Sequence, residues 1–311
     1  MHRRAMVPYL VLSLGVLVVS SAAILIRLAQ EQGMPSLVIA ASRLILAALI
    51  LTPVAWSRAG AELRTLQRRD VWLGIGSGAF LALHFGAWIS SLEYTSVASS
   101  VALVTTNPLW VGLATFMLYR ERLHWATLSG IVLTISGSIL IAYSDSVTSP
   151  HANPLLGNAL ALLGALAVSG YFLIGRTLRQ RLSLLAYIWL VYSAAAATLL
   201  VLIVLTRQAL LGYSYLAYGL ALGLAVGPQL LGHTAFNWAL RYLSATFVAI
   251  AILGEPIGSA LLALVWFEEQ FAPLQLVGFV LLLAGIYVAT FNERPAVPAQ
   301  ADEAVSSMAQ N

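Results

Sequence analysis

Ten stretches of about 20 mainly apolar residues follow one another along nearly the whole chain, and each is long enough to cross a bilayer as a helix. Only 9% of the 311 residues are charged and 60% are hydrophobic, which does not fit a soluble domain. We therefore expect an all-α integral membrane protein of about ten transmembrane helices. The expected spans are residues 7–28, 35–57, 70–92, 97–119, 124–144, 154–176, 184–206, 214–240, 244–267 and 273–292.

The distribution of arginine predicts how these helices are oriented. With a cytoplasmic N-terminus, thirteen of the 16 arginines lie in inside segments and two, Arg27 and Arg207, in outside segments. Basic residues accumulate in cytoplasmic loops, so this bias predicts that both termini are cytoplasmic. We expect a multi-pass protein of the bacterial inner membrane. The arginines are scattered through short loops, which does not indicate nucleic-acid binding.

An internal repeat relates the two halves of the chain. A shift of 148 residues superposes six identical residues in order and without gaps, and five helices in each half require that the second half enters the membrane from the opposite side. We expect a five-helix repeat at 1–144, a linker at 145–153, an inverted second repeat at 154–292 and a disordered cytoplasmic tail at 293–311. The matching pairs are Tyr94 and Tyr242, Ser96 and Ser244, Pro108 and Pro256, Glu121 and Glu269, Gly130 and Gly278, and Gly137 and Gly285.

The motifs in both halves resemble the EamA-type branch of the drug/metabolite transporter superfamily. The resemblance covers residues 7–292 and implies a ten-helix metabolite carrier, often an exporter of amino acids or similar small solutes. The motifs are Thr106-Asn107-Pro108, Tyr119-Arg120-Glu121-Arg122-Leu123, Leu253-Gly254-Glu255-Pro256, Phe267-Glu268-Glu269 and the four repeated glycines. The residue before the repeated proline differs between the halves, so the resemblance does not carry a substrate over.

Glu255 lies near the centre of the ninth expected helix, where an ionised acid costs at least about 2.5–3.5 kcal/mol on insertion scales. It is a candidate for proton coupling, and its alternative is a structural acid bonded to a neighbouring helix. Asn107 is its counterpart in the fourth helix and could bind substrate or pack between helices. Pro108 and Pro256 each free a backbone carbonyl one turn earlier, which predicts a kink or hinge at mid-depth.

Two helix faces carry polar and aromatic side chains that should avoid lipid. His84 and Trp88 are four residues apart on the third helix, as are Gln229, His233 and Asn237 on the eighth. We interpret both faces as cavity walls, where His84 and Trp88 could stack on an aromatic or cationic solute and His233 could titrate. Packed histidines and an interfacial tryptophan are the structural alternatives.

Two further residues are predicted to belong to the substrate pathway. Arg43 lies eight residues into the second helix and could extend outward to the interface, bind a substrate carboxylate, or pair with Glu255 or Glu93. Tyr171 is a candidate lining residue of the sixth helix.

The sequence contains no catalytic constellation, no metal-spaced cluster, no phosphate loop and no cysteine, so we expect neither an enzyme nor a cofactor. The expected function is a secondary transporter for small metabolites, driven by a gradient, with lipid bilayer, substrate and protons as partners. A lipid-handling membrane protein or a non-transporting sensor is the alternative. A polar central cavity would favour transport, and a lateral groove open to lipid would favour lipid chemistry.

Overall fold

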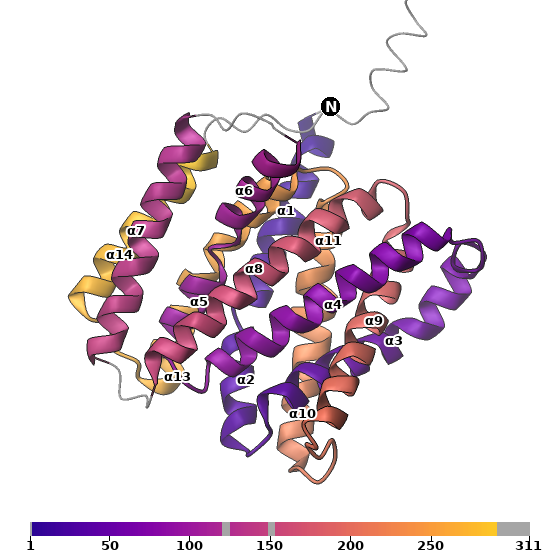
Figure 1. Ribbon diagram of the computed structural model, residues 1–311, viewed down its shortest axis with the longest axis horizontal. Coiled ribbons are helices and arrows are strands. Elements are labelled where there is room, and N and C mark those ends of the chain that lie inside the picture. Colours follow the sequence, from indigo (N-terminus) through magenta and orange to yellow (C-terminus); the bar gives the residue numbers. More distant parts are fainter. Residues whose placement is uncertain (1, 120–124, 149–152, 291–311) are drawn as a thin grey trace, which may run out of the picture.

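The computed structural model describes residues 2–119, 125–148 and 153–290, and all their secondary structure is helical (Figure 1). Eight helical segments are long and apolar enough to cross a membrane, and two shorter apolar helices, within α7 and α14, complete the expected ten. The prediction of an all-helical membrane protein is therefore confirmed. The spans are α1 and α2 (His2–Val19, Ala22–Glu31), α3 (Ser36–Arg64), α4 (Arg68–Ser91), α5 and α6 (Val97–Val104, Asn107–Tyr119), α7 (Trp125–Thr148), α8 (Pro154–Arg179), α9 (Leu184–Leu205), α10, η1 and α11 (Tyr215–Leu224, Ala225–His233, Thr234–Ala239), α12, η2 and α13 (Ala245–Ala251, Ile252–Gly254, Glu255–Phe267) and α14 (Pro273–Thr290).

Some boundaries differ from the sequence prediction. Helix α3 continues through Pro53 to Arg64 before it ends, and α7 continues to Thr148, so the first four residues of the expected linker are helical. Asn153 then begins α8, because its side chain accepts a hydrogen bond from the backbone N–H of Leu156 (3.2 Å). The rest of the expected linker before Asn153, and the expected C-terminal tail from residue 293, lie outside the described residues.

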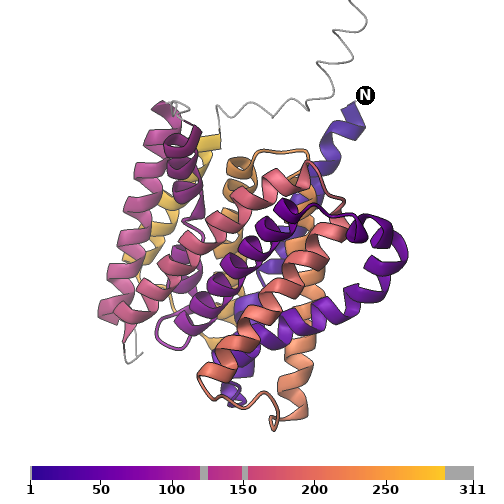
Figure 2. The same ribbon diagram turned by 45° about the vertical axis from the view of Figure 1, so that its right-hand side comes forward.

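The two halves pack in opposite directions. In the fourth and ninth spans, α5 packs against α13 and α6 against α12, so the first part of one span meets the second part of the other. The first and eighth spans are also antiparallel, because α2 packs against α10 and α1 against η1 and α11. Helices α7 and α14 lie side by side along one edge (Figures 1 and 2). This arrangement is that of two inverted five-helix repeats.

Repeated residues also begin the fourth and ninth spans in the same way. The Ser96 side chain accepts from the backbone N–H of Ser99 (3.2 Å), and the Ser244 side chain accepts from that of Phe247 (3.0 Å). A serine cap satisfies one of the amide groups that a helix N-terminus leaves without a partner. The same local signal, 148 residues apart, therefore starts equivalent helices.

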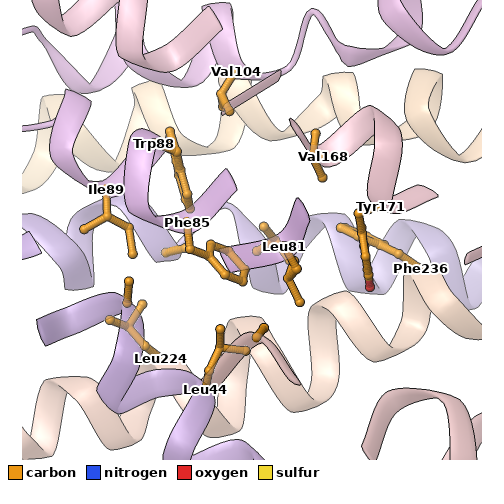
Figure 3. Packing of buried hydrophobic residues seen from close by; sticks show 14 of the residues in the cluster. Leu44, Leu81, Phe85, Trp88, Ile89, Val104, Val168, Tyr171, Leu224 and Phe236 are labelled. Carbon is orange, nitrogen blue, oxygen red and sulfur yellow. The ribbon is translucent and has the colours of Figure 1, made fainter. Parts of the chain in front are cut away.

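Helix α4 lies between α8 and α9 in the main hydrophobic core, and Figure 3 shows part of this core. Phe85 and Trp88 of α4 and Tyr171 of α8 are almost completely buried in this core. Large apolar side chains such as Leu200 and Val201 of α9 remain exposed on the outer surface. In a spanning bundle such side chains face the lipid, so about half of each span is left for packing inside the molecule.

Candidate functional site

A central cavity lies where two broken spans meet α4, α8 and η1. The fourth span breaks between Val104 and Asn107, and the ninth changes to a short 3₁₀ helix over Ile252–Gly254. Each break comes within about one turn before the repeated proline, which lacks the N–H that would continue the helix. A helix break thus precedes both Pro108 and Pro256, and the hinge at each stays a prediction. The lining residues are Val19, His84, Trp88, Val104, Thr105, Asn107, Val168, Phe172, His233, Phe236, Ile252 and Glu255.

Asn107 and Glu255 occupy equivalent places on this cavity, each as the first residue of the helix after its break. Both are buried, with exposed fractions of 1% and 5%. The Asn107 backbone carbonyl accepts from the Ser169 hydroxyl (3.2 Å), whereas its side-chain oxygen has no hydrogen-bond partner among the described residues. The inverted repeat therefore places one amide and one carboxyl group at two half-helix N-termini, which favour negative charge.

The two histidines form an aromatic wall on one side of the cavity. The His84 ring stacks on Trp88, with centroids 5.8 Å apart and planes 15° apart, and lies 6.3 Å from the His233 ring. The His84 Nδ1 atom lies 3.0 Å from the carbonyl oxygen of Gly164 on α8, which fixes the ring orientation. The His233 Nδ1 and Trp88 Nε1 atoms have no partner within the described part of the chain. The wall can therefore offer stacking surface and hydrogen-bonding nitrogens to a solute.

Gln229, His233 and Asn237, which were expected to line the cavity together, do not all reach it. Residues Ala225–His233 adopt a π-helix around Pro228, and π-helical i→i+5 bonding changes the angular register that an α-helix would give. His233 lines the cavity, but neither Gln229 nor Asn237 does. Sequence spacing could not reveal this change, because it assumes an α-helix throughout.

Asn237 and Tyr171 belong to a hydrogen-bonded cluster beside the cavity. The Tyr171 hydroxyl donates to Asn237 Oδ1 (2.6 Å), and Asn237 Nδ2 donates to the Tyr192 hydroxyl (3.1 Å). All three side chains are fully buried. The cluster joins α8, α9 and α11, so these two predicted pathway residues support the site from outside the cavity wall in this conformation.

Arg43 is fully buried and does not extend to the membrane interface. Its guanidinium carbon lies 4.0 Å from the centroid of the Phe85 ring, in a cation–π contact. It interacts electrostatically with Glu255, but no described carboxylate lies within 4.0 Å of it. Glu93 instead accepts a hydrogen bond from the Ser36 hydroxyl. Neither pairing that was considered for Arg43 is therefore formed.

The family model for the EamA-like transporter family matches the chain twice, over residues 6–143 and 155–291. The chain belongs to this family. It is 22% identical to Uncharacterized transporter YetK of Bacillus subtilis (strain 168), over 94% of this chain and 89% of that protein. It is 23% identical to Biotin transporter of Escherichia coli (strain K12), over 79% and 81%. A crystal structure that is 17% identical superposes with a TM-score of 0.69, covering 91% of this chain and 97% of that one, which supports the fold alone. The EamA chain is thus a multi-pass membrane transporter.

An ion pair of the EamA chain was not predicted from the sequence. Arg27 of α2 pairs with Glu269, which follows α13, and also donates to the carbonyl oxygen of Thr95 (3.0 Å). Glu269 also accepts from the backbone N–H of Val97 (3.3 Å). The pair joins the two halves on the predicted outer side. Arg27, one of the two arginines in outside segments, and the repeated Glu269 were both visible in the sequence, but nothing in it indicated their contact.

A second hollow of about 560 Å³ lies between α5, α6, α7 and α8. Its walls are mainly apolar, with Thr106, Ser138 and Asn158 as polar members, and its rim includes exposed side chains such as Leu155 and Ile139. Thr106 lines this groove while its neighbours Thr105 and Asn107 line the central cavity. The break in the fourth span therefore separates the two hollows.

Proposed function

We propose that this EamA transporter is a secondary transporter that exports small polar or amphipathic metabolites, amino acids included, by alternating access at the central cavity. The observation that carries the proposal is the meeting of two broken, inverted spans around a cavity with a carboxyl, an amide and two histidines. Half-helix termini at mid-depth are the usual way in which transporters present backbone and side-chain groups to a solute.

The size of the cavity supports a mechanism that includes closed intermediates. Its volume of about 30 Å³ corresponds to about two water molecules. A metabolite such as an amino acid needs more room, so binding requires that α5–α6 and α12–α13 move apart at their breaks. The Arg27–Glu269 pair ties the predicted outer side together, so export would include its opening.

Glu255 is the proposed proton-coupling residue. It is the carboxyl group among the lining residues, and its electrostatic partner Arg43 lies behind the cavity wall. A carboxyl group in low dielectric is far costlier ionised than neutral, so solute binding and proton binding there should be linked. The Glu255→Gln variant keeps the shape and removes the titration.

The substrate class is supported by the wall chemistry and by one relative. The stacked His84 and Trp88 rings suit a flat or apolar body, and Asn107 suits a polar head group. A relative is named Biotin transporter, and biotin and amino acids both combine an apolar part with a carboxylate. These features favour small organic acids and amino acids over inorganic ions.

The test is flux in proteoliposomes with a panel of radiolabelled amino acids, amines and biotin, with and without a pH gradient. We expect saturable flux that the gradient accelerates, and in Glu255→Gln the loss of that acceleration. Glu31→Gln, at an exposed acid, is the matched control and should behave as wild type. Unchanged pH dependence in Glu255→Gln would remove proton coupling from the proposal, and absence of flux for every solute would refute transport.

The second hollow, the groove between α5, α6, α7 and α8, favours a second candidate function, the handling of a lipid-like amphiphile. Its apolar walls and exposed rim belong to helices α7 and α8, which are expected to span the bilayer, so an acyl chain could enter there. Replacing Ile139 by tryptophan should obstruct this groove and leave the central cavity unchanged. Loss of flux for amphipathic solutes alone would support lateral entry, whereas equal flux for all solutes would assign the substrate path to the central cavity.

A further inference from the structure

Among the described residues, two arginines are almost completely buried, and they differ in how their guanidinium groups are satisfied. Arg179 is 1% exposed, and its Nε and Nη1 atoms donate to the carbonyl oxygens of Asn237 (3.0 Å) and Leu182. Arg43 is 0% exposed, and its Nε, Nη1 and Nη2 atoms all lack a hydrogen-bond partner among the described residues. Arg179 is therefore a structural residue, whereas the donors of Arg43 are free for another partner.

The surroundings of Arg43 offer further free hydrogen-bonding groups. Gln229, on the π-helix that packs against α3, is completely buried, and both its side-chain oxygen and nitrogen lack partners in the described structure. Tyr192 links the two residues, because it interacts electrostatically with Arg43 and its hydroxyl donates to the Gln229 carbonyl oxygen (3.5 Å). Unsatisfied buried groups are costly, so a guanidinium and an amide without partners on two helices that pack together point to a ligand.

The Phe85 ring contacts both Arg43 and a residue that lines the central cavity. The Arg43 guanidinium lies over one face of the Phe85 ring. The centroid of the Phe85 ring is 5.2 Å from the centroid of the His233 ring, and His233 lines the cavity. Figure 3 shows Phe85 pointing from α4 into the packed interior. The buried guanidinium therefore lies one ring contact away from the cavity wall.

We propose that the substrate carries a carboxylate, which Arg43 binds through paired N–H donors. The Gln229 amide lies beside the bound carboxylate, and the Phe85 side chain rotates to open the way between Arg43 and the cavity. The proposal rests on the transport function argued above and names its substrate class. A guanidinium matches a carboxylate geometrically, because two parallel N–H groups meet two oxygens. Bound this way, the substrate charge neutralises Arg43, while Glu255, which lines the cavity, remains available for a proton or for a substrate ammonium group.

The experiment separates binding from transport. Purified protein is tested by thermal denaturation with phenylalanine and biotin, and with phenylalaninamide, phenethylamine and biotinamide, which keep the apolar bodies without the carboxylate. The acids should raise Tm and the other compounds should not. Proteoliposome flux of the same compounds should favour acid over amide by at least about 100-fold, because a site built for a charged group rejects an analogue that leaves it unpaired.

Variants assign the effect to the proposed residues. Arg43→Gln should lose the acid-induced rise in Tm, Arg43→Lys should keep part of it, and Gln229→Leu should weaken acid binding. Arg179→Gln, the matched buried arginine, should lower basal stability and leave the acid-to-amide ratio unchanged. The comparison of acids with amides in the wild-type protein remains decisive if an arginine variant fails to fold.

The possible results discriminate between the two proposals. Flux of amines and amides as fast as that of acids, with Arg43→Lys indifferent, would overturn the carboxylate site and keep the transporter. Acid binding that depends on Arg43, without flux of any compound, would keep the site and refute transport. A rise in Tm for biotin but not for phenylalanine would support the site with simple carboxylates as its ligands, and the reverse would support it with zwitterions.

Discussion

Helices α7 and α14 approach each other closely at the repeated glycines, which we call the glycine seam, and this contact allows a quantitative test of the inverted repeat. A Cβ atom added to Gly137 would lie 2.5 Å from the carbonyl oxygen of Gly278 and 2.7 Å from the backbone nitrogen of Leu282. One added to Gly285 would lie 2.6 Å from the carbonyl oxygen of Gly130. Because the repeat shift is 148 residues (285 − 137 and 278 − 130), these are the same contact seen from the two halves. The alanine variants of Gly137 and Gly285 should therefore have nearly equal effects.

The magnitude follows from the distances. Ordinary contacts of a Cβ atom begin near 3.4 Å, so an alanine at 137 must push the two helix backbones apart by about 1 Å. Overpacking of this kind costs about 1–3 kcal/mol, and the gain from replacing a helical glycine returns about 0.5–1 kcal/mol. Each variant should therefore lose up to about 2.5 kcal/mol of unfolding free energy. Gly76→Ala is the control, because its added Cβ meets nothing within 4 Å, and it should gain about 0.5–1 kcal/mol.

The assay is denaturant unfolding of the purified protein in detergent or bicelles, followed by tryptophan fluorescence and helicity. Losses of free energy that agree within about 0.5 kcal/mol for Gly137→Ala and Gly285→Ala would support the symmetric seam. A neutral Gly285→Ala beside a destabilised Gly137→Ala would refute the reasoning, since equivalent backbones would then not meet at equivalent glycines. Close backbone approach at small residues is the main way in which spanning helices associate.

Three further predictions concern the ion pair, the buried asparagine and the orientation. Arg27→Glu should weaken closure of the predicted outer side, because it removes the ion pair with Glu269. The measurement is the rate at which a thiol reagent labels a single cysteine placed in the cavity, which should rise. The double variant Arg27→Glu with Glu269→Arg should restore slow labelling. Asn237→Leu should cost about 1–3 kcal/mol of unfolding free energy, because it removes the acceptor of the buried Tyr171 hydroxyl and one partner of the buried Tyr192 hydroxyl. A substrate KM that rises with no loss of stability would contradict this supporting role. Since the chain has no cysteine, single cysteines replacing Gln180 and Leu211 should be labelled by an impermeant reagent from the cytoplasmic and outer sides respectively, and the opposite pattern would invert the predicted topology.

Local residue signals predicted most of the fold. Pro108 and Pro256 predicted the breaks in the fourth and ninth spans, because a missing N–H interrupts a helix whatever surrounds it. Spacing along the chain placed His84 and Trp88 on one face of α4, and they do stack at the cavity. The π-helix at Gln229 was not predictable in this way, since its register depends on how the eighth span packs against α1 and α3.

The sequence by itself determined the membrane class, the ten helices and the inverted repeat, because lipid demands long apolar helices and repeated motifs mark equivalent positions. Only the tertiary structure decided which polar residues meet. The sequence left several pairings open for Arg43, but in the structure its guanidinium lies over the Phe85 ring and has free donors. The Asn237 side chain forms hydrogen bonds with two tyrosines. Side chains on different helices come together through packing of whole helix faces, and that three-dimensional arrangement is not encoded in any one segment.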